Sequence, residues 1–302
     1  MGDIKLFKIE SNKVQLIIGK AVEVERSLQR LIENHLDAFL GVHFIATEYS
    51  TGRTHGGRID TMGIDENFCP VIIEYKRAIN ENVINQGLYY LDWLLDHQAE
   101  FELMVRKKNL LTTEDSIEWN GTRLICIAND FTKFDVYSIN QINRNIELIR
   151  YQKFEDDLLL LDLVSRSAGS AEVSGRVNGA RPGRDSTVED RLERAPASLR
   201  DLYESLKAYL IALGDDIQVN AVKNYFAFKR LRNFACIDIK PQNHELVAWL
   251  NLDPSTVEMV TGFTRDVTKI GHHGTGNVEV TIANQTDFEK ALPLFQKSYD
   301  LN

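Results

Sequence analysis

The sequence predicts an α/β protein in which a mixed sheet flanked by helices is followed by a small α+β domain. Three observations predict this organisation. Helix-like and strand-like patterns alternate along residues 22–130. The run RLICIAND, residues 123–130, begins with the apolar residues of a central strand. Residues 165–196 are rich in Gly, Ser, Ala and Arg, so they predict a flexible linker between domains 1–164 and 197–302.

The elements of the first domain follow from the spacing of apolar residues and from turn residues. A helix is predicted over 22–41, because its apolar residues share one face and Gly41 ends it. A strand at 43–50, a Gly-rich turn at 51–57 and strands at 58–65 and 70–77 come next. A helix over 82–98, the strand at 123–130 and one or two strands within 145–164 complete the domain. The core order is α-β-β-β-α-β.

The second domain is predicted to contain two helices and three strands. The first helix covers 198–215 and the closing helix covers 286–300, with Thr286 or Asp287 as its N-cap. The strands are predicted at 234–241, 245–252 and 278–284, with a turn at 253–255.

Composition narrows the classes of function. No run of about 18 apolar residues occurs, so we expect no membrane span. Three widely spaced cysteines without a CxxC pair indicate a reducing, cytoplasmic setting and no structural zinc. The net charge of −9 argues against a broad electrostatic grip on nucleic acid, although a local basic groove stays possible. Residues 1–164 hold 26 acidic against 18 basic residues, which is expected of a domain with metal-binding carboxylates.

Three charged residues lie where strands should be apolar: Asp60, Glu74 and Lys76. Alternation in a strand points Glu74 and Lys76 to one face, and Asp60 lies on the neighbouring strand. Two carboxylates held close together repel, and a divalent cation such as Mg²⁺ or Mn²⁺ would stabilise them. A nearby lysine can orient water and stabilise charge on a phosphate. These residues therefore suit metal-assisted phosphodiester hydrolysis. The alternative is that Asp60 and Glu74 are solvated strand-edge residues paired with Arg58 and Lys76.

Asp60 followed by Glu74-Tyr75-Lys76 resembles the PD-(D/E)XK nuclease superfamily, although Ile59 stands where Pro is usual. Gln86 and Tyr90 resemble the Q-x-x-x-Y element of its RecB-like branch, and four-residue spacing places both on one helix face. The resemblance covers roughly residues 20–130 and implies a restriction-endonuclease-like fold. It implies metal binding by Asp60, Glu74, the carbonyl of Tyr75, and Glu25 or, as a weaker alternative, Glu33.

The resemblance implies a metal-dependent nuclease with Asp60, Glu74, Lys76, Gln86 and Tyr90 as catalytic residues. Its expected substrate is nucleic acid, DNA rather than RNA, in repair or antiviral defence. The alternatives are a catalytically silent scaffold with the same fold and a nucleotide-binding regulatory protein. A homodimer or a protein partner would help an acidic protein hold a polyanion.

The second half contains two unusual stretches. The turn GHHGTG, residues 271–276, could present backbone N–H groups to an anion or could be a hairpin loop. The stretch KNYFAFKRLRNFACI, residues 223–237, interleaves basic and aromatic residues, which suits either nucleic-acid contact or a core with a solvated rim. This half resembles DUF5655, a domain of unknown function, which supplies a boundary and no chemistry.

Overall fold

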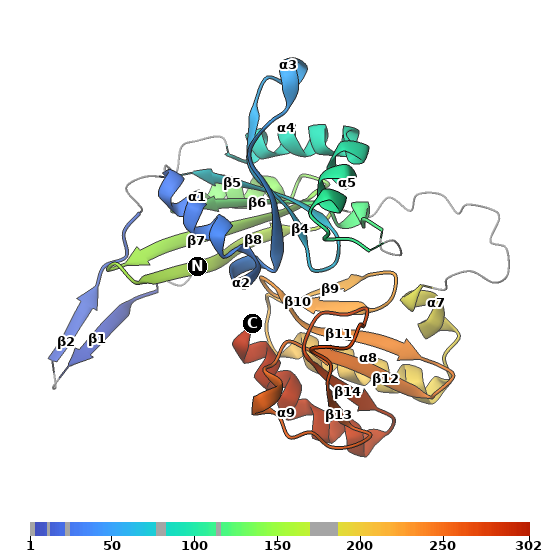
Figure 1. Ribbon diagram of the computed structural model, residues 1–302. Coiled ribbons are helices and arrows are strands. Elements are labelled where there is room, and N and C mark those ends of the chain that lie inside the picture. The colour runs from blue at the N-terminus through green and yellow to red at the C-terminus, as the bar shows by residue number, and fades with distance from the viewer. Residues whose placement is uncertain (1–3, 11–12, 22–24, 77–82, 113–115, 170–186) are drawn as a thin grey trace. The chain divides into compact units, whose positions relative to one another are not determined.

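A computed structural model of the chain describes residues 4–10, 13–21, 25–76, 83–112, 116–169 and 187–302 (Figure 1). The chain divides into two compact units, Met1–Ser174 and Gly175–Asn302. Among the described residues, no helix is both long enough and apolar enough to cross a membrane.

Unit 1 is built on a mixed sheet of six strands in the order β3-β4-β5-β6-β7-β8. These strands are β3 (Val42–Ser50), β4 (Arg58–Asp65), β5 (Pro70–Lys76), β6 (Arg123–Ala128), β7 (Asn145–Phe154) and β8 (Leu158–Ser167). The pairs β5–β6 and β6–β7 are parallel, and the other neighbours are antiparallel. All six residues of β6 are buried, which agrees with the predicted central strand.

Helices cover both faces of this sheet. They are α1 (Glu25–Asn34), α2 (Leu36–Leu40), α3 (Gly52–His55), α4 (Val83–Asp96), α5 (Gln98–Lys107) and α6 (Lys133–Ile139), with a 3₁₀ turn at Trp119–Gly121. Helix α1 contacts the face that carries Thr61, whereas α4 contributes to the core on the opposite face with Met62. Gly87 lets α4 approach β6 closely, because a Cβ there would lie 2.4 Å from a Leu124 methyl.

The predicted order α-β-β-β-α-β occurs in unit 1, with local differences. The helix expected over 22–41 is interrupted at His35, whose φ of −135° is not helical, and Gly41 ends α2 in the left-handed conformation as predicted. Residues 22–24 lie outside the described part. The predicted Gly-rich turn contains the short helix α3 between two glycines with positive φ. Helices α5 and α6 were not predicted.

The N-terminal residues form a hairpin of their own. Strands β1 (Leu6–Glu10) and β2 (Lys13–Ile17) pair antiparallel and make up a separate two-stranded sheet. Backbone hydrogen bonds in both directions between Lys20 and Lys153 attach this hairpin to the end of β7. The sequence reasoning did not predict these strands.

A buried ion cluster links three strands of the large sheet. Arg123 at the start of β6 donates to Asp65 at the end of β4, and its Nε lies 3.4 Å from Glu147 Oε1 on β7. All three side chains are buried. Asp65 also accepts the backbone N–H groups of Asn67 and Cys69, so the cluster fixes the β4–β5 turn.

Unit 2 is an antiparallel six-stranded sheet in the order β13-β14-β12-β11-β10-β9, with three helices. Its strands are β9 (Gln218–Ala221), β10 (Phe226–Lys229), β11 (Asn233–Lys240), β12 (Glu245–Leu250), β13 (Thr264–Asp266) and β14 (Val278–Ile282). Its helices are α7 (Val188–Glu193), α8 (Ala197–Ala212) and α9 (Gln285–Leu301), with a 3₁₀ turn at Pro254–Thr256. Leu206 of α8 and Phe295 of α9 are buried in the main hydrophobic core of this unit.

The second half corrects several boundaries. The predicted linker is too long at both ends, because β8 reaches Ser167 and α7 begins at Val188, which is fully buried. Residues 170–186 lie outside the described part. Helix α9 is capped by Asn284 rather than Thr286 or Asp287, since Asn284 accepts the Asp287 N–H at 3.0 Å. The short strands β9, β10 and β13 were not predicted.

Replacing Arg123 with Ala should destabilise the protein by about 3 kcal/mol or more, because two buried carboxylates would lose their cation. Urea unfolding followed by circular dichroism measures this change. Arg106→Ala removes an exposed arginine paired with Glu102 one helical turn away, and it should change stability by less than about 0.5 kcal/mol. Equal effects of the two substitutions would contradict the structural role of the cluster.

Candidate functional site

Strands β4 and β5 stop pairing at the position of the two predicted carboxylates. The last ladder pair is Thr61 opposite Ile73. Beyond it, the Asp60 backbone N–H donates to Glu74 Oε1 at 3.1 Å, and the Tyr75 backbone N–H donates to Asp60 Oδ2 at 3.0 Å. The two carboxylates thus take the place of backbone acceptors where the strands separate. The structure brings Asp60 and Glu74 together, as the sequence predicted.

Burial dominates the electrostatics of this pair. Glu74 is fully buried, and burial, followed by the charge of Asp60, raises the pKa of Glu74 to about 9. Burial also raises the pKa of Asp60 to about 6, against the effect of the Tyr75 N–H and the positive charge of Lys76. Glu74 Oε2 is buried and has no hydrogen-bond partner among the described residues. Full burial excludes the interpretation of Glu74 as a solvated strand-edge residue.

Helix α1 supports the site from the opposite face of the sheet. The buried Gln29 donates through Nε2 to the Asp60 carbonyl at 2.9 Å and to Glu33 Oε1 at 3.1 Å. Glu33 accepts the Thr61 hydroxyl at 2.6 Å. Glu33 therefore holds β4 in place. Glu25, the other predicted metal ligand of this helix, acts on Asp60 through its charge, which raises the pKa of Asp60. Sequence reasoning missed Gln29, although a glutamine beside Leu28 on a buried helix face was a signal.

The side chains of Gln86 and Tyr90, both on α4, lie next to the start of β4. The Tyr90 hydroxyl accepts the Arg58 backbone N–H at 3.2 Å and lies 3.4 Å from Gln86 Nε2. Tyr90 is buried, and Gly57 leaves room for its ring, since a Cβ on Gly57 would lie 2.6 Å from the hydroxyl. These contacts make Tyr90 a residue that positions the strand carrying Asp60.

Glu48 is a third carboxylate near this site that sequence reasoning did not single out. Thr47 pairs with Thr61 and Tyr49 with Ile59, so Glu48 lies opposite Asp60 on the neighbouring strand. Its charge raises the pKa values of both Asp60 and Glu74, and its own carboxylate lies 3.4 Å from Arg58 Nε. Arg58 thus pairs with Glu48, whereas the solvated strand-edge alternative gave it a site carboxylate as its partner.

Asp60 and Glu74 are the residues that could hold a metal ion at this site. Among the described residues, no group of three or more His, Cys, Asp or Glu side chains is arranged to hold a metal. Mg²⁺ commonly binds through one or two carboxylates and keeps several waters. Asp60 and Glu74, whose Oε2 is buried and unpartnered, could supply these two carboxylates.

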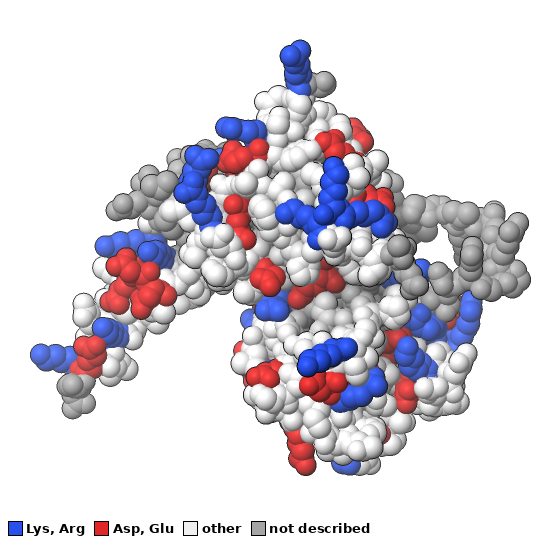
Figure 2. Space-filling model, viewed as in Figure 1, with Lys and Arg blue, Asp and Glu red and all other residues white. Residues whose placement is uncertain are grey.

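The loop over the hairpin of β3 and β4 is fixed by aromatic contacts. The Tyr89 hydroxyl donates to the His55 carbonyl at 2.8 Å, and the His55 ring lies 5.1 Å from the Tyr89 ring. Arg53 on this loop and Arg58 at the start of β4 are exposed. On the face shown in Figure 2, basic and acidic side chains are interspersed.

The two unusual stretches of unit 2 have structural roles. Tyr225, Phe226 and Phe228 are buried, so they cannot stack on bases, and the interpretation as a nucleic-acid surface is wrong. In the GHHGTG turn, His272 stacks on Trp249, and its two ring nitrogens lie 2.8 and 3.0 Å from the carbonyls of Ile270 and Gly276. The turn is an ordered loop between β13 and β14, with the two histidines contacting different partners.

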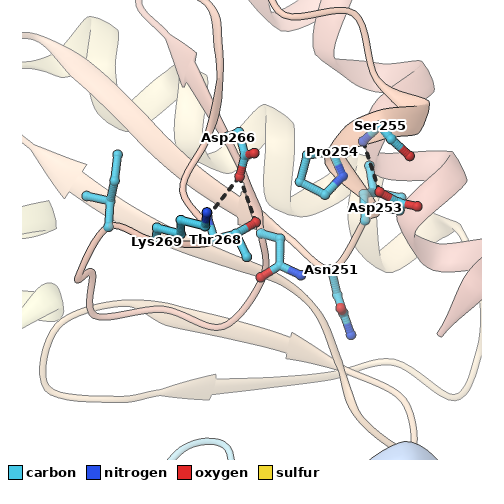
Figure 3. Close-up of a pocket in the computed structure, with 10 residues that line it drawn as sticks. Asn251, Asp253, Pro254, Ser255, Asp266, Thr268 and Lys269 are labelled. Carbon is cyan, nitrogen blue, oxygen red and sulfur yellow. Dashed lines mark hydrogen bonds between the residues drawn. The ribbon is translucent and has the colours of Figure 1, made fainter.

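Unit 2 also carries an open cavity of about 810 Å³ between the Asp253 and Asp266 loops (Figure 3). Asp253 accepts the Ser255 N–H at 2.9 Å, and Asp266 accepts both the N–H and the hydroxyl of Thr268. Both carboxylates are therefore used to hold the turns that form the cavity wall.

Comparisons with known proteins identify the second unit and leave the first without an assignment. The DUF5655 profile, described as a domain of unknown function, matches residues 188–302. A protein of Haemophilus influenzae described as uncharacterized is 28% identical over 304 residues, covering 98% of this chain and 99% of that protein. No solved structure matches the chain. The nuclease resemblance of unit 1 gains no support from these comparisons and stays a prediction.

The raised pKa values predict how stability depends on pH in the absence of metal. A carboxyl whose pKa is higher in the folded than in the unfolded state stabilises the fold at low pH. For Glu74 this contribution is lost as the pH rises from 4.5, the ordinary pKa of a glutamate, to about 9, the pKa of Glu74 in the fold. At about 1.4 kcal/mol per pKa unit the loss should be on the order of 6 kcal/mol, which thermal unfolding in EDTA can measure.

Glu74→Gln keeps the shape of the side chain and removes its titration, so the loss of stability between low and high pH should be smaller in this variant. Asp92→Asn on the exposed side of α4 is the control and should leave the wild-type pH dependence unchanged. If wild type and Glu74→Gln showed the same dependence, the buried carboxyl would not be the titrating group.

Proposed function

We propose that unit 1 is a metal-dependent nuclease of the PD-(D/E)XK type that hydrolyses phosphodiester bonds, with DNA as the preferred substrate. The observation that carries this proposal is the buried Glu74, which shares the end of the β4–β5 ladder with Asp60 and has an unpartnered carboxylate oxygen. The order of strands and helices in unit 1 is compatible with a restriction-endonuclease-like fold.

Asp60 and Glu74 would hold Mg²⁺ or Mn²⁺, with the Tyr75 carbonyl as a third oxygen ligand and Glu25 nearby. When bound, the ion would polarise a phosphate oxygen and lower the pKa of a coordinated water. Ionised carboxylates bind a cation best, so the binding of metal should release protons held by the raised pKa values of this pair.

Lys76 supplies the positive charge of the site. It lies two residues beyond Glu74 on β5, and its charge lowers the pKa of both carboxylates. An ammonium in that place would orient the attacking water and stabilise negative charge that develops on the phosphate. Gln86 and Tyr90 would act by positioning β4 through Arg58 rather than by touching the reacting atoms.

Purified protein should cleave linear, circular or single-stranded DNA in Mg²⁺ or Mn²⁺ and should lose this activity in EDTA. Glu74→Gln and Lys76→Met should each lower the cleavage rate by about 100-fold or more, because each removes a group that stabilises the transition state. Gel assays with RNA as a parallel substrate measure the preference. Asp92→Asn should cleave at the wild-type rate.

Calorimetry separates metal binding from catalysis. Wild type should bind Mg²⁺ with release of protons, and Glu74→Gln should bind it more weakly. Cleavage that survives in both Glu74→Gln and Lys76→Met would overturn the proposed site. Metal binding without cleavage of any substrate would favour the catalytically silent scaffold.

A further inference from the structure

The N-terminal hairpin exposes a continuous apolar face. Phe7 pairs with Leu16 and Ile9 pairs with Val14, so these four side chains project from the same face of the two strands. Their exposed fractions are 49% for Phe7, 47% for Leu16, 74% for Ile9 and 65% for Val14. The opposite face carries the polar residues of the hairpin, including Lys8 paired with Glu10 at 3.0 Å.

Such a hairpin needs a surface to pack against. A two-stranded hairpin is marginally stable in water unless its apolar face is covered. With Ile18, which is also exposed and follows Val14 and Leu16 in the alternation of β2, the apolar patch amounts to on the order of 500 Å². A patch of this size on a water-exposed element marks an interaction site.

We propose that the arm, residues 4–18, pairs with the same arm of a second copy of this chain. Two identical apolar faces can stack about a two-fold axis with the arms antiparallel, which is the closed, isologous arrangement of a homodimer. Two such patches would bury on the order of 1,000 Å² in total, which reaches the lower limit of a specific interface.

Charge favours a second copy over an unrelated apolar partner. The tip of the arm carries the exposed Lys13 opposite Glu10, whose carboxylate is paired with Lys8, whereas the β7–β8 turn beside the base of the arm carries the exposed acids Glu155, Asp156 and Asp157. Residues 4–18 hold three lysines against the one acid Glu10, so an antiparallel pair of arms places the net positive arm of each copy, with Lys13, near the acidic turn of the other. Charged side chains of both signs are visible along the arm in Figure 2.

Two adjacent substitutions on β2 test this dimer. Leu16→Glu adds a charge to the apolar face, and Gln15→Glu adds the same charge to the opposite face. Sedimentation velocity should show wild type and Gln15→Glu approaching twice the 34.5 kDa chain mass at micromolar concentrations. Leu16→Glu should raise the dissociation constant by roughly 30-fold or more. Circular dichroism confirms that each variant is folded.

A charge exchange tests the antiparallel arrangement itself. Lys13→Glu should weaken the dimer, and adding Asp156→Lys with Asp157→Lys to the same chain should restore it. A wild type that stays monomeric at about 100 µM would overturn the proposal. So would a dimer unaffected by Leu16→Glu, or a monomer that binds lipid vesicles through the arm. None of these outcomes depends on nuclease activity.

Discussion

The structure of unit 1 depends on two carboxylates that occupy the end of a β-ladder. Where β4 and β5 separate, Glu74 and Asp60 accept backbone N–H groups that lie beyond the last ladder pair. The burial of Glu74 makes its charge costly unless a cation is present. Gln29 binds the backbone carbonyl of Asp60 and Tyr90 binds the backbone N–H of Arg58, so both helices hold β4 where it carries the pair.

The buried cluster of Arg123, Asp65 and Glu147 in the same sheet shows how a structural charge cluster differs from the candidate site. Asp65 and Glu147 are buried like Glu74, yet Arg123 lies between them and supplies the positive charge. Glu74 has a repelling neighbour in Asp60, and the charge of Lys76 compensates only in part, because the pKa values of both carboxyls stay raised. A carboxylate without full compensation is unfavourable for folding alone, which is typical of a functional site.

Local periodicity predicted the strands that carry the site and the long helices, because each has an apolar face of its own. It also predicted the convergence of Asp60 and Glu74, since alternation and a short turn determine which residues face each other. Glu48 escaped prediction because its place opposite Asp60 depends on an irregular β3–β4 register with a positive φ at Glu48 itself. The role of Gln29 depends on a contact 31 residues distant along the chain, which no local pattern encodes.

The arm was missed for a related reason. Its strands are five residues long and their alternation is short, so the pattern KVQLI is weak evidence for a strand. Exposure, which only the structure gives, makes the arm informative. If unit 1 acts on a polyanion as proposed, the net charge of −9 opposes binding, and a dimer would place two copies of its basic groups on one substrate. The same dimer would bury the apolar face of the arm, so one interface would both remove apolar surface from water and strengthen the binding of the substrate.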